Sequence, residues 1–265
     1  MPTPLVAPRP VSAVLITLDA ATSLAATLET LAFADEIVVV DSGSSDGTPE
    51  IARRYGARVI EQPWLGFGPQ KAFAVAQARN DWVLCLDADE RLSPALAASI
   101  AEALGGAGEP AHQAWRMARC NRFLGRYLRH GEGYPDWNLR LFHRAHARWS
   151  DDAVHEHVLT EAPVGTLAGD LLHDSAETLA GYLHKQNRYT TLAAESAVAA
   201  GKRVGAAQLL FSPLVRFVKF YLVRQGFRDG LPGLVHIVIG CFNSFVKYAK
   251  MLEIRRSAVQ EKVTQ

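Results

Sequence analysis

Apolar and polar positions in the N-terminal part of the chain form a pattern that predicts short strands separated by helices. Apolar runs of strand length occupy residues 11–17, 37–40, 58–60 and 82–86. Between the first two runs, Leu24, Leu28 and Leu31 recur at helical spacing. Strands that alternate with helices are typical of a parallel sheet with right-handed crossovers, so the sequence predicts an α/β fold.

Two of these apolar runs are followed by acidic residues. The second run leads into Asp41-Ser-Gly-Ser-Ser-Asp-Gly-Thr48, and the fourth leads into Asp87-Ala-Asp-Glu90. The carboxyl ends of parallel strands lie on one edge of a sheet, where open α/β folds bind their ligands. Carboxylate oxygens favour Mg²⁺ or Mn²⁺, and these ions usually also bind substrate phosphates. We therefore expect a metal–diphosphate site with Asp87 and Asp89 as ligands; the alternative is a solvated acidic turn before a helix that Ser93-Pro94 would start.

Asp41 is a candidate for binding a nucleoside at the same edge. A carboxylate accepts hydrogen bonds from a nucleobase N–H or from ribose hydroxyls. The loop after Asp41 offers backbone N–H groups and a helix N-terminus, with Thr48 as the expected N-cap, and both features suit anions. Thr17, which ends the first run, and Ser42 are grouped with Asp41 as donor-binding candidates. The alternative is an ordinary turn, because Asp, Ser and Gly are turn residues.

These motifs resemble those of the family 2 inverting glycosyltransferases of the GT-A fold, a Rossmann-like, mostly parallel sheet flanked by helices. Later segments resemble bacterial lipopolysaccharide core β-glucosyltransferases, which add glucose to a heptose of the inner core. They are Gly66-Phe-Gly-Pro-Gln-Lys71, Tyr134-Pro-Asp-Trp-Asn-Leu-Arg-Leu-Phe142, His155-Glu156 and Gly226-Phe-Arg-Asp-Gly230. The resemblance runs from about Val11 to about Glu253 and implies a UDP-sugar donor, a divalent metal and inversion at the anomeric carbon. Many relatives have Asn-Glu where this chain has Leu18-Asp19, so Asp19 is expected only as a helix-start carboxylate.

The resemblance also guides the expected domain organisation. A GT-A catalytic domain is expected at residues 1–200, with a nucleotide-sugar half at about 11–104 and an acceptor half at about 111–200. A basic amphipathic helical region is expected at residues 201–265.

The acceptor half holds the candidates for a general base, which an inverting transfer needs to remove the acceptor proton. By resemblance, Glu156 falls where the superfamily usually places this carboxylate, so Glu156 is the first choice. Asp136 is the second choice, because it adjoins Trp137 and an aromatic face beside a carboxylate suits sugar binding; it is alternatively a turn residue. Asp151 and Asp152 remain further candidates.

Two cations and a histidine complete the predicted site. Lys71 and Arg140 are candidates for contact with the diphosphate; the alternatives are a solvated helix residue for Lys71 and an ion pair with a neighbouring acid for Arg140. His173 follows another apolar run and is a candidate third metal ligand, because imidazole can complete a Mn²⁺ shell. A zinc site of His155, Glu156 and His157 is a rival hypothesis.

The C-terminal region is basic although the chain carries a net charge of only +1. Residues 202–256 contain ten Lys or Arg residues and two acids, Asp229 and Glu253. Leu210, Leu214 and Phe217 recur at helical spacing, and a second apolar run at 234–251 is broken by polar residues. Because a spanning helix needs about 20 mostly apolar residues, neither run is expected to span a membrane. We expect basic amphipathic helices that lie on anionic lipid, and the alternative is a helical subdomain packed on the catalytic core.

The sequence therefore favours an enzyme that transfers a hexose, glucose by resemblance, from a UDP-sugar to a lipid-linked lipopolysaccharide core heptose. It is expected in the cytoplasm, peripheral on the inner face of the cytoplasmic membrane. The alternatives are a family 2 transferase acting on polyprenyl phosphate or another surface glycan, and a non-catalytic nucleotide-sugar-binding protein. The basic residues belong to no recognised nucleic-acid module, which argues against a nucleic-acid partner. Three widely spaced cysteines argue against a disulfide or a cysteine-based zinc site.

Overall fold

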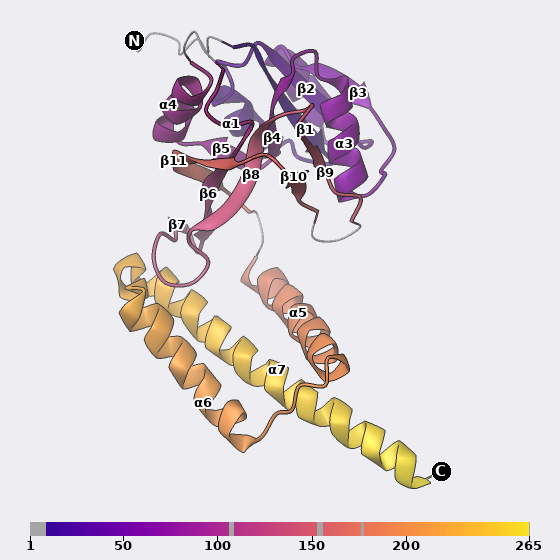
Figure 1. The fold of residues 1–265 in the computed structure, drawn as a ribbon, viewed down its shortest axis with the longest axis vertical. Helices are drawn as coiled ribbons and strands as arrows, with labels where there is room; N and C mark the ends of the chain where they lie inside the picture. The colour runs from indigo at the N-terminus through magenta and orange to yellow at the C-terminus, as the bar shows by residue number, and fades with distance from the viewer. Residues whose placement is uncertain (1–8, 106–108, 153–155, 176–177, 265) are drawn as a thin grey trace. The chain divides into compact units, whose positions relative to one another are not determined.

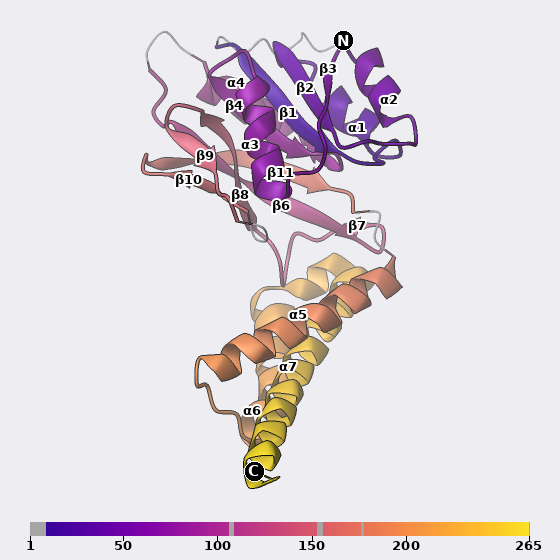
Figure 2. The same cartoon turned by 90° about the vertical axis from the view of Figure 1, so that its right-hand side faces the viewer.

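A computed structural model describes residues 9–105, 109–152, 156–175 and 178–264. The chain divides into two compact units, which Figures 1 and 2 show from two directions. Unit 1 comprises Met1–Cys120 and Pro135–Asp174, and unit 2 comprises Asn121–Tyr134 and Ser175–Gln265.

Four parallel strands form one half of the sheet in unit 1, as the apolar runs predicted. Their order is β3-β2-β1-β4, and the helices α1, α2 and α3 connect them in sequence. The strands are β1 (Val11–Thr17), β2 (Glu36–Asp41), β3 (Arg58–Glu61) and β4 (Trp82–Asp87). The helices are α1 (Leu24–Glu29), α2 (Thr48–Arg54) and α3 (Phe67–Gln77). β1 and β4 are apolar on both faces because helices cover both, which explains why their sequences read as continuous apolar runs.

The sheet continues beyond β4 with strands that the sequence analysis did not specify. β8 (Asp136–His143) pairs antiparallel with β4 and with β6 (Ala114–Phe123), so the sheet is mixed. β11 (Val164–His173) pairs antiparallel with the short β5 (Glu90–Leu92), and α4 (Pro94–Ala103) packs on β11. β9 (Ala147–Trp149) and β10 (Val158–Thr160) form a separate two-stranded sheet, and β7 (Arg126–Tyr127) pairs with the end of β6. The predicted α/β sheet flanked by helices is therefore confirmed.

Two apolar clusters fill the opposite faces of this sheet. One gathers Leu15 and Leu84 with Leu28 of α1 and Ile100 of α4. The other gathers alternate residues of the same strands with α3, β8 and β9, and includes Val14, Val83, Ala74, Phe142 and Trp149. Because successive strand residues point to opposite faces, each strand contributes to both clusters. This packing fixes the strand ends that carry the acidic motifs.

Of the two expected N-caps, one is confirmed and one is wrong. Ser93 is the N-cap of α4, as expected, and its Oγ accepts a hydrogen bond from the backbone N of Leu96 at 3.3 Å. The expectation that Thr48 caps α2 is wrong, because Gly47 occupies that position with φ 84°. Thr48 is the first helical residue, and its hydroxyl donates to the carboxylate of Asp46 at 2.5 Å.

Unit 2 is built from three long helices. α5 (Leu179–Ala199) and α6 (Ala206–Phe217) both pack on α7 (Gly230–Thr264), which lies between them (Figure 1). A π-helical turn at Val218–Val223 extends α6, and a 3-10 turn at Gly226–Asp229 leads into α7. α5, which the sequence analysis assigned to the acceptor half, belongs to this unit.

The helices of unit 2 extend further than the apolar runs indicated. The π-helical turn continues α6 beyond Pro213, and α7 continues past the polar residues that interrupt its apolar run. As a result, 206–223 and 226–257 are long and apolar enough to cross a membrane by length and composition, contrary to the expectation from the runs. Length and composition do not by themselves separate a crossing helix from a helix in the membrane plane.

Gly169 of β11 tests how closely α4 packs on the sheet. Both Gly169 and Gly56 have positive φ, 92° and 78°, but a Cβ at Gly169 would lie 2.3 Å from the backbone N of Leu96, whereas a Cβ at Gly56 meets nothing within 4 Å. Gly56→Ala should lower the free energy of unfolding by about 1 kcal/mol, the cost of a left-handed residue. Gly169→Ala should cost about 3 kcal/mol or more, because α4 must move.

Urea unfolding followed by tryptophan fluorescence measures both changes, since Trp82, Trp115 and Trp149 are buried in unit 1. Equal losses in the two variants would show that the close approach of α4 to β11 contributes no constraint of its own.

Candidate active site

The two acidic motifs lie at the same edge of the sheet. In the strand register Thr17 of β1 pairs with Asp41 of β2, and Ile16 of β1 pairs with Asp87 of β4. Asp41 and Asp87 therefore end strands on either side of β1. This is the arrangement on which the predicted diphosphate site depends.

Asp41 is buried, and its own loop occupies its acceptor positions. Oδ1 accepts from the backbone N of Gly43 at 3.0 Å and of Ser44 at 2.8 Å, and Oδ2 accepts from the hydroxyls of Thr17 at 2.7 Å and Ser44 at 2.5 Å. Burial alone would raise the pKa of Asp41, but these hydrogen bonds outweigh burial and hold its pKa below the ordinary value. Asp41 thus shapes the loop, and a direct bond to a nucleoside would require one of the two hydroxyls to turn away.

Asp19 ties the loop after β1 to the loop after β2. Its Oδ1 accepts from the backbone N of Ser45 at 2.8 Å, and its own N donates to Ser44 Oγ at 2.8 Å. α1 begins five residues later, after the N-cap Ser23. The expectation of Asp19 as a helix-start carboxylate is therefore wrong, and its strained φ of 47° is held by these bonds.

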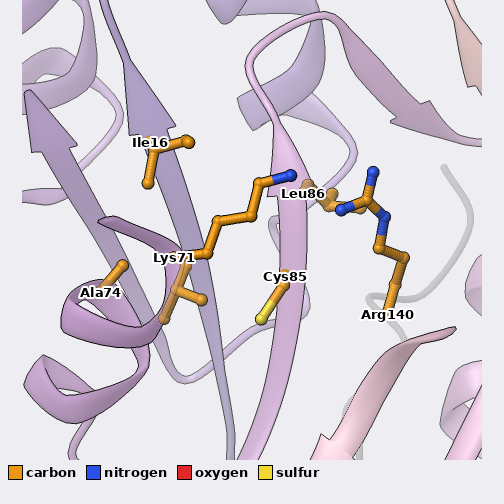
Figure 3. Close-up of a pocket in the computed structure, with 7 residues that line it drawn as sticks. Ile16, Lys71, Ala74, Cys85, Leu86 and Arg140 are labelled. Atoms are coloured by element: carbon orange, nitrogen blue, oxygen red, sulfur yellow. The ribbon is translucent and has the colours of Figure 1, made fainter. Parts of the chain in front are cut away.

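Lys71 and Arg140 both pair with Asp87, and Figure 3 shows these two side chains on either side of the strand that carries Cys85 and Leu86. Lys71 Nζ of α3 lies 3.0 Å from Asp87 Oδ1, and Arg140 Nη2 of β8 lies 2.9 Å from Asp87 Oδ2. Lys71 is only 5% exposed, so the alternative of a solvated helix residue is wrong. Burial would raise the pKa of Asp87, but Arg140 and Lys71 together lower it far below the ordinary value. Between the two cations lies Cys85, and burial raises the pKa of its thiol to about 12, which keeps it neutral.

These contacts belong to a longer series of alternating charges, here called the charge chain. It runs in the order Glu156, Lys71, Asp87, Arg140, Glu90, Arg119 and Asp136. Successive partners are separated by 2.9, 3.0, 2.9, 2.9, 3.5 and 2.8 Å. All seven residues belong to unit 1, and they come from α3, β4, β5, β6, β8 and the segment before β10.

Glu90 and Arg119 are the members of the charge chain that the sequence analysis missed. Glu90 is 0% exposed; Oε1 meets Arg140 and Arg119, and Oε2 accepts from the backbone N of Asp87 at 3.0 Å. Its place in the acidic motif was visible in the sequence, but its burial was not. Arg119 lies within β6, and no local pattern marked it.

A pocket of about 350 Å³ opens on one side of the charge chain, a size typical of small-molecule sites. Its wall includes Asp87, Arg140, Glu156 and the aromatic rings of Trp137 and Trp149. Arg140 Nε is buried and has no hydrogen-bond partner among the described residues. The pocket thus combines aromatic faces, which suit a sugar ring, with cations and carboxylates.

Of the candidate bases, Glu156 has the surroundings that suit proton transfer. It lines the pocket, its side chain is partly exposed, and Lys71 Nζ lies 2.9 Å from Oε1. Asp136 is instead held by the Nε and Nη2 atoms of Arg119 at 2.9 and 2.8 Å. Asp151 and Asp152 are both exposed, and Asp152 lies 3.6 Å from His157 Nδ1. His155, part of the motif that pointed to Glu156, lies outside the described residues.

Asp89 and His173 form the part of the site that fits a divalent metal. His173 Nε2 at the end of β11 lies 3.3 Å from Asp89 Oδ2, and both side chains are partly buried. Neighbouring ligands of an octahedral ion with bonds of about 2.1 Å stand about 3 Å apart, so this pair fits two adjacent positions. Both oxygens of Asp87 are already held by cations, so a metal role for Asp87 would compete with Lys71 and Arg140.

Within the part of the chain that the structure describes, no three His, Cys, Asp or Glu side chains form a complete metal shell. The rival zinc site includes His155, which lies outside the described residues, so it stays a hypothesis. The Asp89–His173 pair would need oxygens from a bound diphosphate and water to complete its coordination.

Comparison with known proteins agrees with this geometry. Residues 12–162 match the family described as "Glycosyl transferase family 2". The chain is 34% identical to the lipopolysaccharide core biosynthesis glycosyltransferase LpsC of Rhizobium meliloti, over 92% of each chain. It is 30% identical to an uncharacterized glycosyltransferase of Rickettsia typhi, over 83% of this chain and 78% of that protein.

The mannosyltransferase PcManGT of Pyrobaculum calidifontis has a similar structure, with a TM-score of 0.50 over 92% of this chain and 87% of that chain. At 18% sequence identity this similarity shows the fold alone. The family match, which covers more than half of the chain, and the similarity to LpsC along nearly its whole length establish the family. The chain therefore belongs to glycosyltransferase family 2 and is a glycosyltransferase with a GT-A-like α/β fold.

Proposed function

We propose that this enzyme transfers a hexose from a UDP-sugar to a lipopolysaccharide core sugar with inversion at the anomeric carbon. The observation that carries the proposal is a single pocket lined by Glu156, Asp87, Arg140 and two tryptophans at the carboxyl edge of the sheet. The similarity to LpsC supports a core saccharide as acceptor. The choice of UDP and of glucose rests on the resemblance of the motifs to core β-glucosyltransferases.

The donor would lie along the acidic edge. Thr17 and Ser42 would hold the nucleoside, together with Asp41 once the hydroxyl of Thr17 or Ser44 turns away from its carboxylate, and Asp89 and His173 would hold Mg²⁺ or Mn²⁺ beside the diphosphate. PcManGT, which shares the fold, is described in complex with GDP-Man and Mn²⁺. When bound, the metal supplies electrostatic stabilisation of the leaving diphosphate, worth several kcal/mol. Lys71 and Arg140 place two further positive charges next to Asp87 at the same edge.

Glu156 acts as the general base for the acceptor hydroxyl. The acceptor oxygen forms a bond to the anomeric carbon as the bond from that carbon to the diphosphate oxygen breaks. UDP leaves with the bonding electron pair, and the acceptor proton passes to Glu156. Lys71 Nζ, 2.9 Å from Oε1, positions the carboxylate on the wall of the pocket.

The acceptor would be a saccharide anchored in lipid, and the enzyme would work peripherally on the inner face of the cytoplasmic membrane. The basic residues of unit 2 support this location, because anionic lipids attract them. Holding enzyme and acceptor on one surface raises the encounter rate through effective concentration. A polyprenyl-phosphate acceptor would share the same donor site, so acceptor trials separate the two functions.

Glu156→Gln should keep donor binding and lose about 10²- to 10⁴-fold in turnover, because the amide cannot accept the proton. Asp136→Asn serves as the matched control, since it also converts a carboxylate of the charge chain into an amide. Radiolabelled sugar transfer and calorimetry with UDP measure the two properties. A near-normal rate in Glu156→Gln, together with a large loss in Asp136→Asn, would contradict the assignment of Glu156 and identify Asp136 as the base.

His173→Ala and Asp89→Ala should each abolish most Mn²⁺-dependent hydrolysis of UDP-glucose, because each removes one of the two paired ligands. His157→Ala, a substitution of an exposed histidine, should leave the metal dependence unchanged. A titration of Mn²⁺ binding by calorimetry with UDP present gives a second measure. If only His157→Ala lost metal affinity, the zinc hypothesis would replace this one.

A donor screen tests the proposed nucleotide. UDP-glucose should bind more tightly than GDP-mannose or ADP-glucose, and its affinity should rise when Mn²⁺ is added. Calorimetry with each donor, with and without the metal, provides the comparison. Tighter binding of GDP-mannose would contradict the UDP assignment while leaving the family unaffected.

A further inference from the structure

The helices α6 and α7 of unit 2 have large apolar side chains on their outer surfaces. On α6 and its π-helical extension, these residues are between 49% and 71% exposed: Leu210, Phe211, Leu214, Val215, Val218, Leu222 and Val223. On α7, the corresponding exposed residues are Leu231, Val238, Phe242 and Phe245. So many large apolar side chains exposed on two helices that pack on each other are unusual on a protein surrounded by water.

The contacts between the helices of unit 2 are instead rich in polar groups. Ser212 Oγ of α6 lies 2.6 Å from Ser244 Oγ of α7. Asn243 of α7 donates to Gln186 of α5 at 2.9 Å. Arg216 of α6 forms an ion pair with Glu132 within the same unit. Ala194, Ile237 and Met251 are buried in the same unit, so the interior of unit 2 combines apolar residues with hydrogen-bonded polar pairs, while large apolar side chains are exposed outside.

Lys250 extends the polar interior between α5 and α7. Its Nζ donates to the backbone O of Asn187 at 2.8 Å and to the hydroxyls of Thr190 at 3.0 Å and Thr191 at 2.7 Å. In hydrocarbon, hydrogen bonds between helices satisfy polar groups that no solvent can satisfy, and ionisable residues face the interior of the bundle. Pro213, inside α6, is likewise better tolerated in a membrane helix than in a soluble one.

The charges limit how the helices can meet a bilayer. Residues 206–215 and 230–246 contain no Lys, Arg, Asp or Glu. At 1.5 Å per residue these segments are about 15 Å and 25 Å long, shorter than a hydrocarbon core of about 30 Å. Basic residues flank both ends of the charge-free segments, at Lys219, Arg224 and Arg228 on one side and at Lys202, Arg203 and Lys247 on the other.

We infer that the outer faces of α6 and α7 are covered by the acyl chains of an anionic lipid leaflet. The helices lie in the plane of the leaflet below its headgroups, and the flanking Lys and Arg side chains reach up to the phosphates. This inference rests on the proposed membrane location, but it is independent of the donor, the base and the metal. It goes beyond electrostatic attachment, because the apolar side chains enter the hydrocarbon.

Dye labelling of single cysteines tests the inference on the full-length protein. Cys85 and Cys120 are buried, so Cys241→Ala provides a background with low reactivity. An environment-sensitive dye is attached at Leu214→Cys on α6 or Phe242→Cys on α7. Leu192→Cys on α5 is the matched control, because Leu192 is 50% exposed but lies on a helix outside the proposed lipid face. Vesicles of phosphatidylethanolamine and phosphatidylglycerol carry bromine on the acyl chains or on the headgroups.

Dyes at positions 214 and 242 should shift to the blue on addition of vesicles and lose more emission to acyl-chain bromine than to headgroup bromine. The dye at position 192 should show neither change. Stronger quenching by headgroup bromine at all three positions would overturn the inference in favour of a surface-bound protein. A blue shift without vesicles that grows with protein concentration would instead identify a second copy of the chain as the occupant.

UDP-glucose hydrolysis is measured on the same labelled proteins. Retained hydrolysis without acyl-chain quenching would refute lipid insertion and leave the proposed catalysis standing. Acyl-chain quenching without hydrolysis would support insertion and count against the proposed function alone.

Discussion

The ion pairs of Lys71 with Asp87 and Glu156 are the contacts on which the active site depends. An unpaired charge in a protein interior costs several kcal/mol, so each buried member of the charge chain needs its neighbours. Removing Arg140 would leave the fully buried Glu90 with only the longer contact to Arg119, at 3.5 Å, as its ion pair within the charge chain. Arg140 and Lys71 hold the pKa of Asp87 well below its ordinary value. The free energy of folding that these ion pairs contribute is therefore fully present at pH values above the ordinary carboxyl pKa. It is lost as the pH falls through the lowered pKa of Asp87.

The charge chain also explains why this sheet has both parallel and antiparallel strands. The parallel half brings Asp41 and Asp87 to one edge. The arginines of the charge chain, however, lie outside this parallel half. β8 and β6, which pair antiparallel beyond β4, supply Arg140 and Arg119. α3 supplies Lys71, and its Gly68 permits the close approach to Ser150 O, where a Cβ would stand 2.2 Å away. The charge chain thus lies where the two halves of the sheet join.

Unit 2 differs from unit 1 in where its polar and large apolar side chains lie. In unit 1, apolar side chains fill two clusters inside and charges are buried only when paired. In unit 2, hydrogen-bonded polar side chains occupy the helix contacts, and leucines and phenylalanines face outward. Exposed apolar side chains of this kind are what the proposed contact of unit 2 with lipid would require.

The amino-acid sequence by itself determined the local elements and the position of the acidic edge. β1 begins and ends where its apolar run does, and Ser93 caps α4, because burial pattern and capping are local properties. The motifs at Asp41 and Asp87 also identified the family. Only the tertiary structure decided that Lys71 is buried, that Glu90 and Arg119 join the site, and that Thr17 and the loop after Asp41 occupy the acceptor positions of Asp41. These outcomes depend on the order β4-β8-β6, which brings distant charges within about 3 Å of one another, and no local pattern encodes strand order.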